Sequence, residues 1–174
     1  MTPQTPVTEL DIRFSSSGAA AVPWTDAEST LKDAGIYWLS TVRPDGRPHV
    51  TPLIGVWLEG GFYFSTGDTE RKARNLAANP QVVITTGRNA LSDALDIVVE
   101  GEARSVSDDA KLRHVGDAHA VKYGEGWRLP GLDGVTLFEV RPTTAFGFGR
   151  KDAQAPPPHG GFSQTRWRFS DGGR

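Results

Sequence analysis

The sequence predicts a mainly β protein, in which a closed or nearly closed β-barrel is surrounded by flanking helices. Runs of β-branched and aromatic residues recur from residue 36 to residue 149, and short turn-forming segments separate them. Only two or three stretches carry apolar residues at helical spacing, and the sequence contains no internal repeat. These observations indicate six or seven strands, mostly joined by hairpins, with two or three short helices.

The composition excludes several classes of function. A chain of 174 residues can form one domain with a sizeable core. Its formal net charge of −2 argues against nucleic-acid binding, which usually requires a basic excess. The absence of cysteine excludes disulfides, thiolate catalysis, iron–sulfur clusters and cysteine-ligated zinc. No apolar run reaches the ~18 residues of a membrane helix, and the N-terminus lacks a signal-peptide layout. We therefore expect a cytoplasmic protein with no membrane partner.

A flexible arm and a helix are expected first. Residues 1–22 are rich in Thr, Ser, Pro, Gly and Ala and have little periodicity, which predicts a mostly flexible arm. The segment TDAESTLKDAG begins with Thr25 and places Glu28 three residues later, which is the spacing of a capping box. A short helix is therefore predicted from Thr25 to about Ala34, ending at Gly35.

Three strands of an antiparallel meander should follow. The segment IYWLSTVRPDGRPHVTPLIGVWLEGGFYFST holds β-favouring runs at about 36–43, 47–58 and 61–66. The separating PDG and EGG segments are typical of hairpin turns. A cationic helix is then predicted over about Thr69–Ala78, because the following Asn79-Pro80 ends a helix.

The rest of the barrel should contain three more strands and one more helix. The strands are QVVITTG, ALDIVVEGEARSV with a break at Gly101, and GVTLFEVRPTTAFGFGR. Between the last two strands, Leu112, Val115 and Val121 recur at roughly helical spacing. After a Pro/Gly-rich linker, FSQTRWRFS alternates apolar and charged residues, which predicts a final strand.

The cationic helix is the first candidate site. Arg71, Lys72 and Arg74 occupy its first turns, where the backbone N–H groups favour an anion. At ~100° per residue, the small apolar residues of the helix form one narrow stripe that faces the barrel. Lys72 lies at the edge of this stripe with Asn75 beside it, while Arg71 and Arg74 point further toward solvent. The apolar stripe consists of Ala73, Leu76 and Ala77.

Two interpretations of this helix remain open. Short helices commonly carry their charges into solvent, which is the more frequent case. A phosphate site is favoured by the glycine turn before the helix and by the hydroxyls of Ser65, Thr66 and Thr69. The site is not a Walker loop, because no GxxxxGK[ST] motif occurs.

Other candidate sites are weaker. No two of the four histidines (His49, His114, His119 and His159) have metal-ligand spacing, so no metal site is expected. The GxSxG motif of serine hydrolases is absent. Tryptophans mostly pack in cores or interfaces. Trp167 is the exception to consider, because its flanking arginines could meet an acidic cofactor tail if this segment folds over a pocket.

An ordered set of motifs resembles the pyridoxamine 5′-phosphate oxidase-like family of flavin- and deazaflavin-binding split barrels. The set is DGRPHVTPL, an aromatic strand that ends in FST, RKARNL, and then NP with another strand, within residues 40–85. The resemblance implies a six-stranded antiparallel split barrel of the FMN-binding type. It also implies a homodimer with the cofactor at the subunit interface, and a small-molecule substrate.

The resemblance also implies which residues bind the cofactor. The residues expected to line the isoalloxazine ring are His49, Val50, Thr51 and Pro52. Those expected to hold the phosphate or its neighbouring chain are Ser65, Thr66, Arg71, Lys72 and Asn75. The sequence as a whole is divided into an arm (1–22), a cofactor-binding barrel (23–150), a linker (151–161) and a C-terminal strand or tail on the barrel or partner subunit (162–174). The arm and the Pro-rich linker lie outside the resemblance.

The chain departs from the pyridoxamine-phosphate oxidases of this family at two places. Thr51 stands where they have a phosphate-binding arginine, and TRWRFSDGGR replaces their RLxP-type substrate-binding tail. Both departures disfavour pyridoxamine oxidation. The RKARN and PHVTPL motifs are more similar to the branch that uses the deazaflavin F420, with FMN as the alternative cofactor.

Two classes of function follow from the resemblance. As an oxidoreductase, the protein would pass hydride from its cofactor to an unsaturated or quinone-like molecule. As a binding module, the same barrel would carry FMN, F420 or haem without turnover. An oligonucleotide-binding barrel is a third hypothesis, which the acidic balance disfavours.

Overall fold

The computed structural model describes residues 5–88, 90–128, 134–151 and 161–170. Most of the predicted linker (151–161), together with His159, lies outside these ranges, as do residues 171–174. Among the described residues, no helix has the length and apolar character needed to cross a bilayer.

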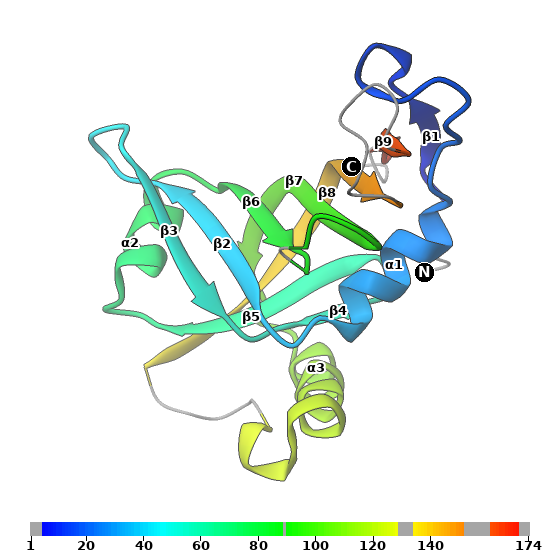
Figure 1. Ribbon diagram of the computed structural model, residues 1–174. Coiled ribbons are helices and arrows are strands. Elements are labelled where there is room, and N and C mark those ends of the chain that lie inside the picture. The colour runs from blue at the N-terminus through cyan, green and yellow to red at the C-terminus, as the bar shows by residue number, and fades with distance from the viewer. Residues whose placement is uncertain (1–4, 89, 129–133, 152–160, 171–174) are drawn as a thin grey trace.

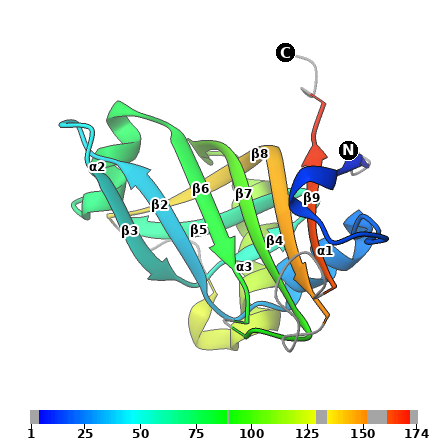
Figure 2. The same ribbon diagram turned by 45° about the horizontal axis from the view of Figure 1, so that its top comes forward.

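An antiparallel sheet forms the body of the molecule (Figure 1). Within the described residues its nine strands are β1 (Val7–Leu10), β2 (Tyr37–Val42), β3 (Pro48–Leu53), β4 (Val56–Leu58), β5 (Gly61–Gly67), β6 (Gln81–Thr86), β7 (Ala94–Ser105), β8 (Val135–Arg150) and β9 (Phe162–Arg168). Their order is β1-β9-β8-β7-β6-β2-β3, and β5 pairs with both β4 and β8. Figure 2 shows β3, β2, β6, β7 and β8 side by side as the sheet curves. The predicted mainly β, split-barrel fold is confirmed, with more strands than expected.

The long strand β8 divides the sheet into two branches. Its first part, Val135–Val140, pairs with β5, and its second part, Thr144–Arg150, pairs with β9. Strand β7 runs beside both parts, with a register shift between Glu100 and Gly101. A Cβ atom at Gly101 would lie 2.3 Å from the carbonyl oxygen of Arg141, so only glycine fits this bulge. The predicted break of the strand at Gly101 is wrong, because β7 continues through this position and Gly101 forms a bulge.

The predicted meander is only partly correct. Strands β2 and β3 form a hairpin, as do β4 and β5, but the expected strand 47–58 is divided between β3 and β4. The division lies at Ile54 and Gly55. A Cβ atom at Gly55 would come within 2.4 Å of the Phe62 ring, so the chain bends tightly around this aromatic residue. After this bend, β5 pairs with β4 and with β8.

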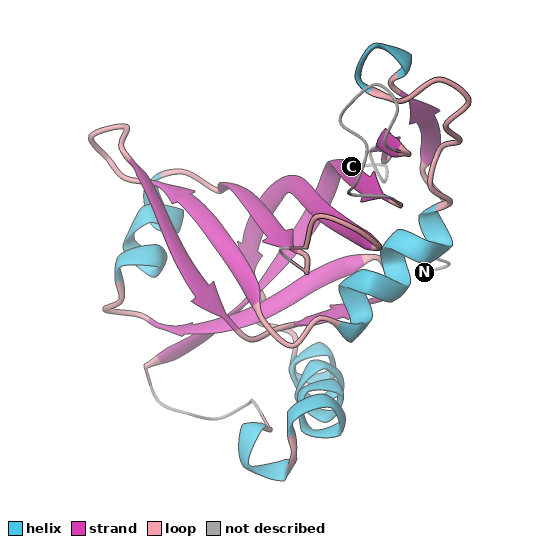
Figure 3. Cartoon of the chain, in the orientation of Figure 1, coloured by secondary structure: helices cyan, strands magenta, loops and turns pink. Residues whose placement is uncertain are grey.

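The α-helices of the described residues lie around the outside of the sheet (Figure 3). Within the described ranges they are α1 (Trp24–Asp33), α2 (Arg71–Ala78) and α3 (Asp109–Tyr123), with 3₁₀ turns η1 (Ile12–Phe14) and η2 (Glu125–Trp127). Helix α1 packs against β4 and β7, α2 against β2 and β5, and α3 against β4. All three helices were predicted.

The predicted capping box of α1 is wrong. The helix begins one residue earlier than expected, with Pro23 at its N-cap and no side-chain cap. The carboxylate of Glu28 instead accepts hydrogen bonds from the Trp57 indole (3.3 Å) and from Lys32 (2.9 Å). Because these partners occupy Glu28, it does not fold back onto the start of the helix.

The N-terminal arm is not flexible over its whole length. Residues Val7–Leu10 form β1, which pairs with Thr165–Arg168 of β9. The Ser16 hydroxyl adds a further link, since it accepts a hydrogen bond from the Phe162 N–H at 3.0 Å. This pairing is remote in sequence, so the local composition of the arm does not reveal it.

Trp167 lies in the core of the barrel. It is 0% exposed and packs edge-on against Trp24, with ring centroids 5.4 Å apart. A Cβ atom at Gly147 would come within 2.4 Å of its ring, so β8 makes room for the indole with a glycine. The alternation predicted for the last strand is confirmed, because Thr165 and Trp167 face inward.

Candidate functional site

The corner between β5 and α2 already holds a negatively charged group. Glu70 stands at the N-cap of α2. Its carboxylate accepts a hydrogen bond from the Gly67 N–H at 3.2 Å and forms a close ion pair with Lys72. These contacts lower the pKa of Glu70, with the Lys72 hydrogen bond as the largest cause. The donors at this corner therefore fit an anion, and the Glu70 carboxylate is a stand-in for one.

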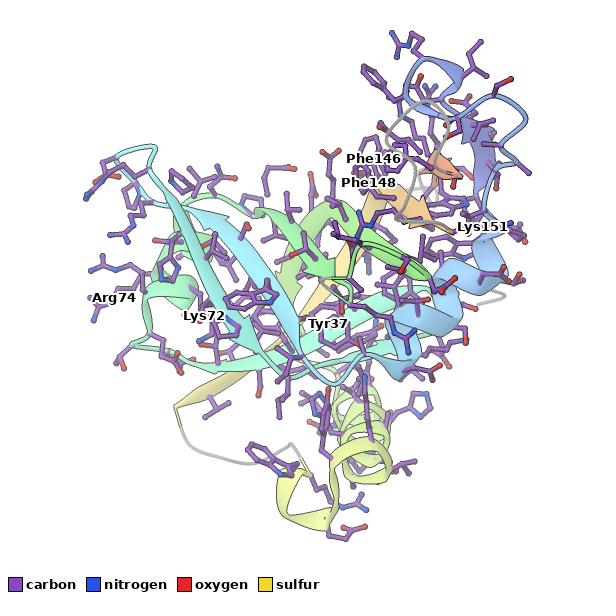
Figure 4. The ribbon with its side chains drawn as sticks, viewed as in Figure 1. Tyr37, Lys72, Arg74, Phe146, Phe148 and Lys151 are labelled. Carbon is purple, nitrogen blue, oxygen red and sulfur yellow. The ribbon has the colours of Figure 1, made fainter. Side chains whose placement is uncertain are left out.

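The side chains of α2 are sorted much as the sequence predicts. Lys72 lies against the strands with a side chain only 12% exposed, whereas Arg74 points into solvent (Figure 4). Arg71 is also exposed. The predicted apolar stripe is wrong at Ala77, which is exposed, because Asn75 takes the inward position.

Asn75 is buried rather than open to a ligand. It is 0% exposed, and its amide donates to the Thr41 hydroxyl at 2.9 Å. Its Oδ1 atom has no hydrogen-bond partner among the described residues. Asn75 therefore ties α2 to β2, and its predicted contact with a cofactor stays a prediction.

His49 on β3 lies close to several positively charged side chains. Its Nδ1 atom lies 3.4 Å from the Thr41 hydroxyl. Burial lowers the pKa of His49 below its ordinary value. Three positive charges lower it further: those of Arg43, Arg71 and Lys72. The imidazole is therefore neutral near neutral pH, and the region between β3 and α2 is cationic.

Arg43 is a residue of this region that sequence reasoning missed. It follows β2 directly, and its Nε atom is buried without a hydrogen-bond partner among the described residues. The register of the β2–β3 hairpin would have predicted the position of Arg43. Since Val42 pairs with Pro48, the residue after Val42 must lie beside the start of β3.

Strand β3 offers one free edge. It pairs with β2 on one side, and no second strand pairing is found for it in the described part of the chain. Its side chains alternate, so the half-buried His49 and Thr51 face one side and the exposed Val50 and Pro52 the other. The four predicted ring-lining residues could therefore meet one flat ligand along the backbone edge, but not with all four side chains.

The structure brings together most, but not all, of the predicted site residues. Thr66 is buried and Ser65 half-buried at the end of β5, directly before the Glu70 corner. Trp167 does not belong to this group. Its burial in the core is incompatible with folding over a pocket, so the side chain proposed to cover a ligand packs the barrel instead.

A separate surface pocket lies elsewhere on the molecule. It has a volume of about 570 Å³ between the end of α1 and the segment before β7. Its lining includes Asp33, Arg88 and Asp93 but none of the residues of the corner. Within the described ranges, no three His, Asp or Glu residues are grouped to hold a metal ion.

Comparisons with known proteins identify relatives of this fold. The family model described as pyridoxamine 5′-phosphate oxidase matches residues 25–148. A pyridoxine/pyridoxamine 5′-phosphate oxidase from Streptomyces avermitilis is 37% identical over 84 residues, which cover 48% of this chain and 37% of that protein. The match thus spans well under half the length of this relative.

Solved structures share the fold. A structure named F420 reductase has a TM-score of 0.52 and 28% identity, and the match covers 68% of this chain and 94% of that one. HutZ, the heme storage protein from Vibrio cholerae, has a TM-score of 0.58 and 24% identity over 68% of this chain and 88% of that one. The same fold therefore occurs in proteins named for different ligands.

Proposed function

Because the chain belongs to the pyridoxamine 5′-phosphate oxidase family, we propose that it is an oxidoreductase that binds a phosphate-bearing flavin or deazaflavin. The observation that carries this proposal is the cationic corner of α2 beside the free edge of β3. F420 is the favoured cofactor and FMN the alternative. The F420 reductase with a similar fold supports this order, as do the motifs PHVTPL and RKARN.

The residues of the chain have distinct roles in this proposal. Lys72, Arg71 and Arg43 hold the phosphate by charge, and Lys72 is the central ligand because it lies nearest the strands. The free edge of β3 orients the ring through backbone N–H and C=O groups. When bound, the cofactor supplies the hydride-transfer chemistry. The substrate class proposed is a small unsaturated or quinone-like molecule.

A homodimer is part of the same proposal. The outer face of β2 and β3 carries Trp38, 47% exposed, beside Val50, 53% exposed. Trp38 pairs across the strands with Pro52, so these residues form one apolar surface. A second copy of the chain that packs here would enclose the ring and exclude water from it.

A binding protein without turnover is the second candidate. At the corner, Glu70 and Lys72 are paired with each other. No other carboxylic acid or lysine among the described residues of the corner and of β3 is placed to donate a proton to a substrate. His49 is kept neutral by its surroundings, and neutral imidazole is a common haem ligand. The same barrel could thus store a flavin, a deazaflavin or haem.

One set of measurements separates these functions. The purified protein is titrated with F420, FMN and haem, and binding is followed by fluorescence or absorbance. Oxidation of the reduced cofactor is then measured with a panel of quinones and α,β-unsaturated carbonyl compounds, and light scattering gives the mass in solution. Turnover supports the enzyme. Tight binding with no turnover on any acceptor supports the carrier, and binding of none of the three contradicts both.

A further inference from the structure

We propose that Glu70 is an internal competitor for the anion site: its carboxylate occupies the donors of the α2 corner until a phosphate displaces it. This inference rests on the proposed function and adds a residue that sets the affinity of the site. A carboxylate is unexpected in a phosphate site, because it repels the phosphate. The inference gives this carboxylate a role.

The contacts of Glu70 are those that a phosphate would use. Its Oε1 atom accepts from the Gly67 N–H at 3.2 Å, and its Oε2 atom is paired with the Lys72 ammonium. The Thr66 hydroxyl also interacts with this carboxylate. A backbone N–H, a hydroxyl and an ammonium are the donors that commonly cradle a phosphate.

Glu70 is held loosely enough to be displaced. Its side chain is 51% exposed, so it can swing into water when another anion takes its partners. No side chain caps the first turn of α2, so Glu70 contributes no cap that displacement would break. Lys72, by contrast, is 12% exposed and stays in place against the strands.

Glu70 neutralises only part of the positive charge near α2. Arg43, Arg71 and Lys72 all act on His49, while Glu70 has a close contact with Lys72 alone among them. A ligand that extends from the donors released by Glu70 toward His49 would therefore meet two further cations. The repulsion that Glu70 exerts is greater for a doubly charged phosphate monoester, as in FMN, than for a singly charged diester, as in F420.

The test uses Glu70→Gln, which keeps the shape of the side chain and removes its charge. We expect FMN and inorganic phosphate to bind about fivefold more tightly to this variant, on the scale of an exposed ion pair, and the gain for F420 to be smaller. Glu125→Gln is the matched control, because Glu125 is also an exposed carboxylate paired with a cation, Arg128. Its affinities should stay those of the wild type.

A second readout does not depend on any cofactor. Inorganic phosphate is titrated into the wild-type protein, and the NMR shift of the Gly67 amide is followed. A saturable shift, reached at lower phosphate in Glu70→Gln, supports the competitor even if no flavin binds, and then only the proposed function fails. Cofactor affinity that is unchanged or weaker in Glu70→Gln would overturn the inference, as would a Gly67 amide that phosphate leaves unmoved in both proteins.

Discussion

Helices α2 and α3 each bring a lysine against the strands of the barrel, but the two lysines have different partners. Lys72 of α2 pairs with the half-exposed carboxylate of Glu70. Lys122 of α3 donates to the Tyr37 hydroxyl at 2.8 Å and to the Gly55 carbonyl at 3.2 Å. The exposed Glu70 side chain can move away from Lys72. The Tyr37 hydroxyl and the Gly55 carbonyl are part of the barrel and cannot move away from Lys122.

The surroundings of Lys122 account for this difference. Burial lowers the pKa of Lys122 to about 8, and the ammonium also lies 4.9 Å from the centre of the Tyr37 ring. Beside it, His119 is 0% exposed, and neither ring nitrogen has a hydrogen-bond partner among the described residues. The comparison teaches that a lysine paired with a displaceable carboxylate fits the proposed ligand site, while a half-buried lysine bonded to the barrel fastens a helix.

The largest expected effect concerns the acid stability of the α3 region. Burial lowers the pKa of His119 to about 4 from an ordinary 6.5. The unfolded chain takes up a proton below pH 6.5 and the folded chain does not, so the stability from neutral His119 is complete above pH 6.5 and is lost as the pH falls toward 4. We expect a loss of ~3 kcal/mol in the free energy of unfolding, from urea titrations at both ends of this window.

The control for this prediction lies on the same helix. His119→Phe removes the titrating group and should flatten the pH dependence by that amount, whereas substitution of the exposed His114 with Gln should leave it unchanged. If the free energy of unfolding falls equally with pH in the wild type and in both variants, His119 is not held neutral in the core beside α3.

The next effect concerns the proposed ligand site of α2. Lys72→Ala should weaken binding of F420 or FMN about 30-fold, about 2 kcal/mol, because it removes a charged hydrogen bond to the phosphate. Arg74→Ala on the same helix should change the affinity less than threefold, since Arg74 points into solvent. Equal dissociation constants for the two variants, measured by fluorescence titration, would make α2 an ordinary solvated helix.

The smallest expected effect concerns Lys122. Its folded pKa of about 8 lies below the ordinary 10.5, so the cost of burying the ammonium is complete below pH 8 and diminishes as the pH rises. Between pH 8 and 10 the wild type should gain about 1 kcal/mol, a value reduced for partial solvent exposure. Lys122→Met should lack this gain while its cofactor affinity stays normal. Altered cofactor binding in this variant would contradict the conclusion that Lys122 only fastens α3 to the barrel.

Most elements of the fold could be predicted because their signals are local. Asn79-Pro80 ends α2, and the alternation around Trp167 marks β9. The pairing of β1 with β9, by contrast, joins segments from opposite ends of the described chain. The bend at Gly55 likewise depends on its approach to Phe62, which no local pattern contains.

The candidate site was predictable to a smaller extent. The angular position of Lys72 follows from helical geometry, and the structure agrees with it. The nearness of Arg43 to His49 depends on hairpin register, and the role of Glu70 on the conformation of a turn. Trp167 was misplaced because an indole between two arginines has the same sequence pattern on a surface and in a core.

The pairing of β1 with β9 has a consequence for the order in which the protein folds as it is synthesised. Strand β1 emerges from the ribosome among the first described residues and must wait for β9, among the last, before its backbone is paired. Trp167, whose indole is fully buried in the core, arrives with the same late strand. A growing chain can therefore form local hairpins early, but closure of the barrel core is a late event that depends on contacts distant in sequence.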